Sequence, residues 1–190
     1  MKNFSDTPLA YFITFSCYGA RVRGDGRGSV DRDNNQYGSP FVSPNRRRAR
    51  VHRSRMKSPA YQLDATRRSL VLQAVKEVCR YRAWELLAVH VRTAHVHTVI
   101  SAESPPEKVM TDLKAYASRR LNEAELDLPG QRRWSRHGST VYLWTPGMLH
   151  HAIDYVLNEQ GAPMAVFAAS GAAANGAATG PSATIRIDTG

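Results

Sequence analysis

The stretch Ala94–Ser101, with the sequence AHVHTVIS, constrains the fold of this chain more than any other part of it. Its Val, Ile and Thr residues favour a β-strand, in which side chains two positions apart point to the same face. His95 and His97 are therefore expected side by side on one face, with Val96 directed into a core on the other. Two neutral imidazoles on a stiff strand can serve as a ligand pair for a divalent metal ion. For an isolated H-x-H, two histidines on a polar sheet surface are the favoured interpretation, so the rest of the chain must decide.

Composition points to one domain with a polyanionic partner. The 190 residues carry a net charge of +10, which is typical of proteins that bind nucleic acid. The sequence contains no run of 18 apolar residues and no apolar signal-peptide core, so we expect no membrane association. The two cysteines, Cys17 and Cys79, are far apart and are expected to be buried thiols, which indicates a cytoplasmic protein.

Hydrophobic periodicity predicts an alternation of strands and helices. Asp64 is expected to cap the first long helix, and Ser104 with Glu107 forms a capping-box pattern before the second. A tight hairpin between the third and second predicted strands would place His90 opposite His97; we expect a surface histidine there, with an extra metal ligand or a substrate contact as alternatives. The predicted strands are 9–17, 84–92, 94–101 and 139–144, and the predicted helices are 63–82, 105–123 and 146–160.

Two segments do not fit this alternation. Residues 20–60 form a basic insertion rich in Gly, Arg and Pro, for which we expect no regular structure. The run of basic residues from Arg46 to Lys57, with no acidic residue among them, predicts contacts with a DNA or RNA backbone, although a merely solvated basic loop is the alternative. Residues 162–190, rich in Ala and Gly, are predicted to be a disordered tail beyond a 1–161 domain. The arginines expected to contact nucleic acid are Arg46, Arg47, Arg48 and Arg50.

The last two predicted helices carry further candidate residues. Helix 105–123 has basic faces, on which Lys114, Arg119 and Arg120 are expected to contact DNA. On the last helix, Tyr155 and Glu159 are four positions apart and so share a face.

The order of these motifs resembles a known protein family. An H-x-H strand, then a basic helix, then a tyrosine on a last helix is similar to the single-tyrosine HUH transposases, and in particular to the REP-associated tyrosine transposases. The resemblance runs from Tyr11 to Gly161, most of the chain. The stretches that carry it are YFITFSCYG, VRTAHVHTVI, LKAYASRRLN, RHGSTVYLW and YVLNEQG.

The resemblance implies a fold and a set of site residues. The fold would be α/β (more strictly α+β), a ferredoxin-like HUH endonuclease fold with a central antiparallel sheet and helices on one side. The family's metal-binding pair falls on His95 and His97, and its nucleophile falls on Tyr155. Its third metal ligand is a polar residue about one turn after the tyrosine; geometry favours Glu159 and residue type favours Gln160, and both remain open. The chain departs from many relatives in having Ala94 where they have Asn, which removes a hydrogen-bonding side chain but no ligand.

The activity that the resemblance implies is single-strand DNA transposition. The enzyme would use Mg²⁺ or Mn²⁺ to cleave and rejoin DNA through a 5′-phosphotyrosine intermediate, at single-stranded or hairpin (REP-like) DNA, and it could act as a homodimer. Two alternatives share the fold: a domesticated, catalytically weak DNA-binding protein, and a replication-type HUH nickase.

Overall fold

Strand β1 (Ala10–Cys17) lies inside a five-stranded sheet and contributes side chains to two apolar cores. Its odd-numbered residues, among them Ile13 and Phe15, are buried on one face, and Phe12 is buried on the other. This alternation follows from the period of two of a β-strand. In this computed structural model the structure describes residues 7–20 and 45–170.

The sheet is antiparallel throughout, in the spatial order β4-β1-β3-β2-β5. The predicted hairpin is confirmed, because His90 pairs with His97 and the backbone N–H of Arg92 donates to the carbonyl of His95. Cys17 and Cys79 are buried free thiols, as expected. The remaining strands are β2 (Glu85–Val91), β3 (His95–Ser101), β4 (Trp134–Leu143) and β5 (Ala165–Ala168).

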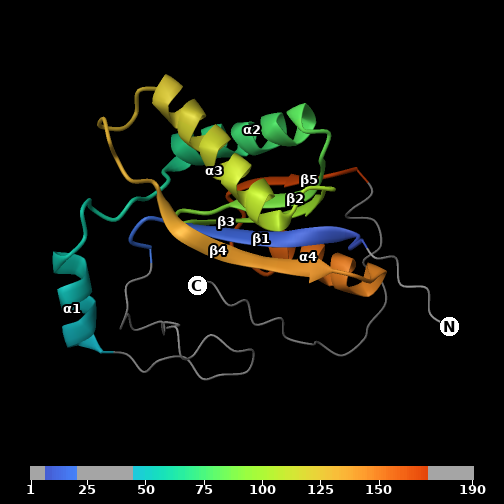
Figure 1. Ribbon diagram of the computed structural model, residues 1–190, viewed down its shortest axis with the longest axis horizontal. Coiled ribbons are helices and arrows are strands. Elements are labelled where there is room, and N and C mark those ends of the chain that lie inside the picture. Colours follow the sequence, from blue (N-terminus) through green and yellow to red (C-terminus); the bar gives the residue numbers. More distant parts are fainter. Residues whose placement is uncertain (1–6, 21–44, 171–190) are drawn as a thin grey trace.

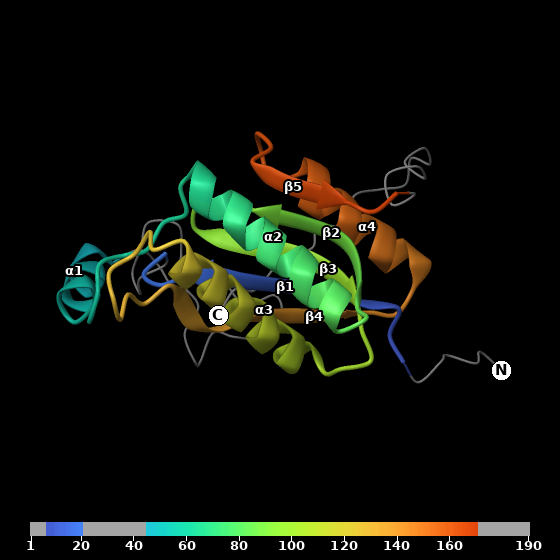
Figure 2. The same cartoon turned by 90° about the horizontal axis from the view of Figure 1, so that it is seen from above.

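Two long helices, α2 (Ala65–Tyr81) and α3 (Pro106–Glu123), cover one face of this sheet (Figures 1 and 2). The chain order β1-α2-β2-β3-α3-β4, with the spatial order β4-β1-β3-β2, is the ferredoxin-like βαββαβ arrangement. The predicted α+β class with a central antiparallel sheet is therefore confirmed.

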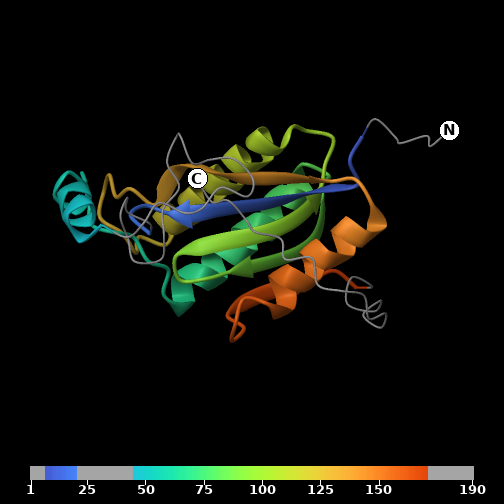
Figure 3. The ribbon, with the colours of Figure 1, turned by 90° about the horizontal axis from the view of Figure 1, so that it is seen from below.

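Helix α4 (Pro146–Asn158) lies on the opposite face, as the view from below shows (Figure 3). The expectation of helices on one side thus holds for α2 and α3 but not for α4. Strands β1 and β3 leave a second apolar surface there, including Phe12 and Val99, which must be covered. Helix α4 covers it with Ala152, Ile153 and Val156.

Local signals located some helix ends correctly and misplaced others. Asp64 caps α2, as predicted, by accepting a hydrogen bond from the backbone N–H of Arg67. The predicted capping box before α3 is wrong: Pro105 is the N-cap residue and no side chain caps the helix. The residue before a proline is disfavoured in helical conformation, so Pro106 at the helix start makes Pro105 the extended boundary residue and excludes Ser104 from the cap.

Three further expectations are corrected. The basic insertion contains a helix, α1 (Arg46–Ser54), capped by Asn45. Strand β4 begins at Trp134, before the predicted start at residue 139, because its polar residues gain hydrogen-bond partners from β1. The tail forms β5, which pairs with β2. Residues 21–44 of the insertion and 171–190 of the tail lie outside the described residues. Among the helices of the described ranges, none is long and apolar enough to span a membrane.

The buried carboxylate of Asp127 fixes the connection between α3 and β4. It accepts hydrogen bonds from the Tyr61 hydroxyl at 2.7 Å and from the guanidinium groups of Arg67 and Arg133, the latter at 2.6 Å. Burial by itself raises the pKa of Asp127, but these hydrogen bonds outweigh it and the pKa lies below its ordinary value. The Asp127 side chain is only 4 % exposed, so this ionic cluster lies within the fold.

Candidate active site

The two histidines of β3 lie on the α4 face of the sheet. The ring centroids of His95 and His97 are 4.7 Å apart, while Val96 between them is fully buried in the opposite core, as predicted. His97 is 4 % exposed, and its Nδ1 lies 2.7 Å from the hydroxyl oxygen of Thr14 on β1. This hydrogen bond holds the imidazole in one orientation, as outer-shell partners of metal-binding histidines do.

Tyr155 of α4 packs directly against this pair. Its ring lies edge-on to His97, with the centroids 5.8 Å apart, and edge-on to Phe12 at the same distance. Phe12 in turn stacks on His97, with an interplanar angle of 18°. The structure therefore brings together the three residues that the sequence placed in the catalytic set, His95, His97 and Tyr155.

The third metal ligand was left open between Glu159 and Gln160. Helix α4 ends at Asn158, so Glu159 is the C-cap and its side chain is exposed. Among the described residues, no three His, Cys, Asp or Glu side chains come together closely enough to hold a metal ion, so Glu159 does not join the two histidines. The half-buried Gln160 donates from its side-chain amide to the Tyr155 carbonyl at 3.3 Å, which ties it to the tyrosine. Two imidazoles together with an amide oxygen would be a donor set that suits a divalent ion.

His90 is neither a surface histidine nor an extra ligand, so both expectations are wrong. It is fully buried, and its Nδ1–H donates to the Val156 carbonyl of α4 at 3.1 Å. Its Nε2 accepts from the backbone N–H of Met164, just before β5, also at 3.1 Å. Burial lowers the pKa of His90, so the neutral ring that these two bonds require is favoured. His90 thus ties the tyrosine helix to the sheet.

The basic residues of α3 lie on the other face of the sheet, away from the histidines. The Lys114 ammonium donates to the carbonyls of Ser135 and His137, and burial lowers its pKa. Arg120 pairs with Glu77 of α2 at 2.6 Å, and Arg119 lies over an α3 tyrosine ring. The structure does not bring these three residues to the His95–Tyr155 site.

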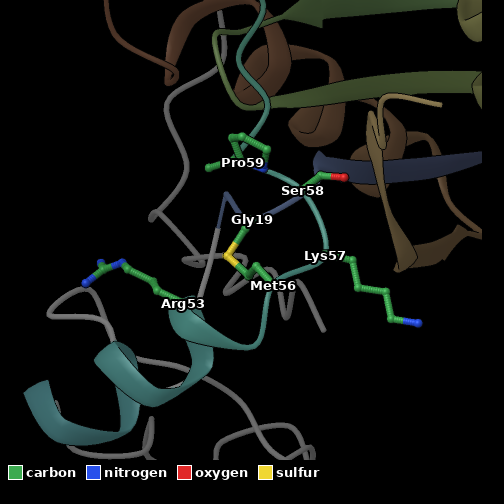
Figure 4. Close-up of a pocket in the computed structure, with 7 residues that line it drawn as sticks. Gly19, Arg53, Met56, Lys57, Ser58 and Pro59 are labelled. Atoms are coloured by element: carbon green, nitrogen blue, oxygen red, sulfur yellow. The ribbon is translucent and has the colours of Figure 1, made fainter. Parts of the chain in front are cut away.

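Helix α1 has five arginines, of which four form what is here called the α1 arginine cluster: Arg46, Arg47, Arg48 and Arg50. All four are exposed. Helix α1 lies beyond the end of the sheet where β1 finishes, and β3 begins at this end with His95 opposite Ser16 (Figure 1). Within the described part of the chain, none of the four pairs with a carboxylate. A pocket of about 450 Å³ lies between the end of α1, the segment that follows it and Gly19 in the turn after β1. Figure 4 shows the Arg53 and Lys57 side chains extending from opposite sides of this pocket.

Sequence reasoning missed the two β1 residues of this site, Phe12 and Thr14. A signal was present, because residues 12 and 14 share a face in a strand and Thr14 is a polar residue in an apolar run. Which strand lies beside His97 depends on sheet order, which local patterns do not encode.

Comparison with known proteins adds family membership to this geometry. A search of curated proteins gives no match. A solved structure, described as the REP associates tyrosine transposase bound to a REP hairpin, is similar with a TM-score of 0.46 and 14% sequence identity, covering 82% of this chain and 68% of that chain. A family model described as "Transposase IS200 like" matches residues 46–149, more than half of the chain. The matched region includes both histidines and ends before Tyr155. The family model therefore does not bear on Tyr155, and it is the ring contact with His97 that places this residue beside the histidines. The chain belongs to the IS200-like transposase family.

Proposed function

We propose that this protein cleaves and rejoins single-stranded or hairpin DNA through a covalent link between Tyr155 and a DNA 5′ phosphate. The observation that carries the proposal is the contact between the Tyr155 ring and His97, whose orientation is set by Thr14. Membership in a transposase family supports DNA as the substrate.

The residues assigned to metal binding are His95, His97 and Gln160, with Mg²⁺ or Mn²⁺ as the ion. A divalent ion bound there would withdraw charge from a phosphate oxygen and make the phosphorus easier to attack. When Nδ1–H of His97 donates to the Thr14 hydroxyl oxygen, Nε2 is the ring nitrogen that carries the lone pair, so we assign Nε2 to the metal.

The chemistry of the Tyr155 step balances without any further reactant. The phenol oxygen loses its proton and forms a bond to phosphorus, the bond between phosphorus and the 3′ oxygen breaks, and that oxygen leaves as a 3′ hydroxyl after taking up a proton. The phosphotyrosine conserves the energy of the phosphodiester, so a second 3′ hydroxyl can reverse the step and join strands. The ring packing against Phe12 and His97 limits the positions that the phenol oxygen can occupy.

Tyr155→Phe tests the proposal, because it removes one oxygen and keeps the ring contacts. Wild-type protein incubated with labelled hairpin DNA and Mn²⁺ should give a protein–DNA band on a denaturing gel, and the Phe variant should give none. Tyr116→Phe, on α3 and the other face of the sheet, is the matched control and should keep the band.

Each alternative gives a different result. A band from the Tyr155→Phe variant places the nucleophile elsewhere and overturns the assignment. Cut DNA without a band means that water is the attacking group. Hairpin binding with neither cut DNA nor a band identifies a DNA-binding protein that keeps only the fold.

A further inference from the structure

Two aromatic side chains at the end of edge strand β4 are exposed and stacked on each other. Tyr142 and Trp144 are 40 % and 42 % exposed, and their rings are nearly parallel, with centroids 6.0 Å apart and an interplanar angle of 11°. Tyr11 packs edge-on against Tyr142, with the centroids 5.2 Å apart, which fixes the inner ring. Among the residues that the structure describes, the pair lies outside both apolar cores, so core packing there does not explain it.

The same edge of the sheet carries a groove of about 400 Å³ between α3 and β4. Thr140, one of its lining residues, points to the same face of β4 as Tyr142, two positions on, so the groove leads toward the aromatic pair. Its floor requires Gly138, because a Cβ there would lie 2.4 Å from the Thr14 carbonyl oxygen and 2.5 Å from the Met110 sulfur. The walls comprise Glu107, Thr111, Lys114, Arg136 and His137.

Charge divides this groove into two halves. Lys114, Arg136 and His137 make the half away from the aromatic pair basic. Near the pair, Glu107 accepts a hydrogen bond from the Thr140 hydroxyl at 3.4 Å, and its carboxylate disfavours a phosphate there. A carboxylate can instead accept a hydrogen bond from an N–H group of an unpaired base. The arrangement therefore matches a ligand that has aromatic bases toward one end and phosphates toward the other.

We propose that the α3–β4 groove and the Tyr142–Trp144 pair bind single-stranded DNA, with unpaired bases stacked on the aromatic pair and a phosphate at Arg136. Stacking on exposed aromatic rings beside a basic groove is how proteins hold single strands without reading their sequence. This inference rests on the proposed function, since it takes DNA as the substrate, and adds a second DNA contact on the face opposite Tyr155. Because β4 is an edge strand of the sheet, a single strand of DNA can pass around β4 from the groove to the face that carries the histidines.

The test measures binding rather than cleavage, in a Tyr155→Phe background. A fluorescent oligothymidine that forms no hairpin is titrated at low salt, and its dissociation constant is obtained from anisotropy. Trp144→Ala and Tyr142→Ala should each weaken binding about tenfold. Trp144→Phe and Tyr142→Phe, which keep a ring, should restore most of the affinity and guard against loss of folding.

Tyr81→Ala is the matched control, because Tyr81 is the more exposed, at 70 %, and lies on α2 away from the groove. Its affinity should stay within about twofold of the parent protein. Arg136→Ser should lower the slope of log affinity against log salt by about one unit, which identifies the phosphate contact.

Two results would overturn the inference. Equal losses for Trp144→Ala and Tyr81→Ala would show that the aromatic pair has no special role. Unchanged DNA affinity in Trp144→Ala, together with a dimer-to-monomer change in sedimentation, would show that a second copy of the chain covers the pair. Either result leaves the covalent Tyr155 band unaffected, whereas loss of that band from wild type is a failure of the proposed function.

Discussion

Replacing His90 with leucine tests whether this buried ring holds the tyrosine helix on the sheet. Leucine fills a similar volume, so the main loss is the pair of hydrogen bonds to Val156 and Met164. Val156 lies in the last turn of α4, where carbonyl groups lack partners within the helix. The substitution therefore leaves one buried acceptor and one backbone donor unsatisfied.

The two bonds are not equally costly to lose. Val156 is fully buried, so its unpaired carbonyl should cost about 1–3 kcal/mol of unfolding free energy. Met164 is 40 % exposed and water can replace the ring nitrogen there, so its loss should cost about 0.5–1.5 kcal/mol. The sum is about 1.5–4.5 kcal/mol, which for a chain of this length lowers the melting temperature by about 3–18 °C.

Thermal unfolding measures the total loss, and hydrogen exchange locates it. His52→Leu is the matched control, because His52 is exposed on α1 and its replacement should change stability by less than about 0.5 kcal/mol. In His90→Leu, amide protection should fall first in α4 and β5, and formation of the Tyr155–DNA band should slow. A melting temperature unchanged from wild type, or protection reduced equally across α2 and α3, would refute the role assigned to His90.

Three further predictions concern the parts around this helix. Thr14→Val, which removes the hydroxyl at Nδ1 of His97 and keeps the volume, should weaken Mn²⁺ binding about 10–100-fold in calorimetry without moving the melting temperature by more than a few degrees. Asp127 should stabilise the fold above its unfolded-state pKa of about 3.9, and this contribution should be lost as the pH falls through its lowered folded-state pKa. The Asp127→Asn variant should therefore be less stable at pH 7, and its free energy of unfolding, measured with urea, should fall less steeply as the pH is lowered. Alanine at all four positions of the α1 arginine cluster should flatten the salt dependence of hairpin binding by about one unit of log–log slope for each phosphate that the variant no longer binds, and an unchanged slope would mean that the cluster is only solvated.

Local patterns predicted the parts of the fold that depend on neighbouring residues. The alternation around His95 and His97, the hairpin pairing of His90 with His97 and the Asp64 cap all depend on residues close in sequence, and all three are confirmed. The contact of Tyr155 with His97 followed from resemblance to a family and not from periodicity, because α4 and β3 meet only through tertiary packing.

What the sequence did not reveal depends on contacts between distant segments. Burial of His90 requires α4 and β5 to cover it, and both come more than fifty residues later in the chain. Strand β5 has only four residues in an Ala-rich segment, so its pairing with β2 supplies the order that its composition lacks. Helix α1 carries almost no apolar residue, so the periodic signal that marks other helices was absent.

The path of the chain after β4 has a consequence for movement of Tyr155. The chain leaves the sheet at one edge, crosses beneath it as α4 and rejoins it as β5 at the opposite edge (Figure 3). Tyr155, the proposed nucleophile, therefore sits on a segment that is anchored at both ends, by β4 at its start and by His90 and β5 at its finish. A segment attached to the sheet at both ends cannot rotate outward about a single hinge. A large displacement of α4 from the sheet would therefore strain the pairing of β5 with β2 and the hydrogen bonds of His90. If Tyr155 carries a DNA end as proposed, we expect the strength of that short pairing to influence how readily the DNA end is moved.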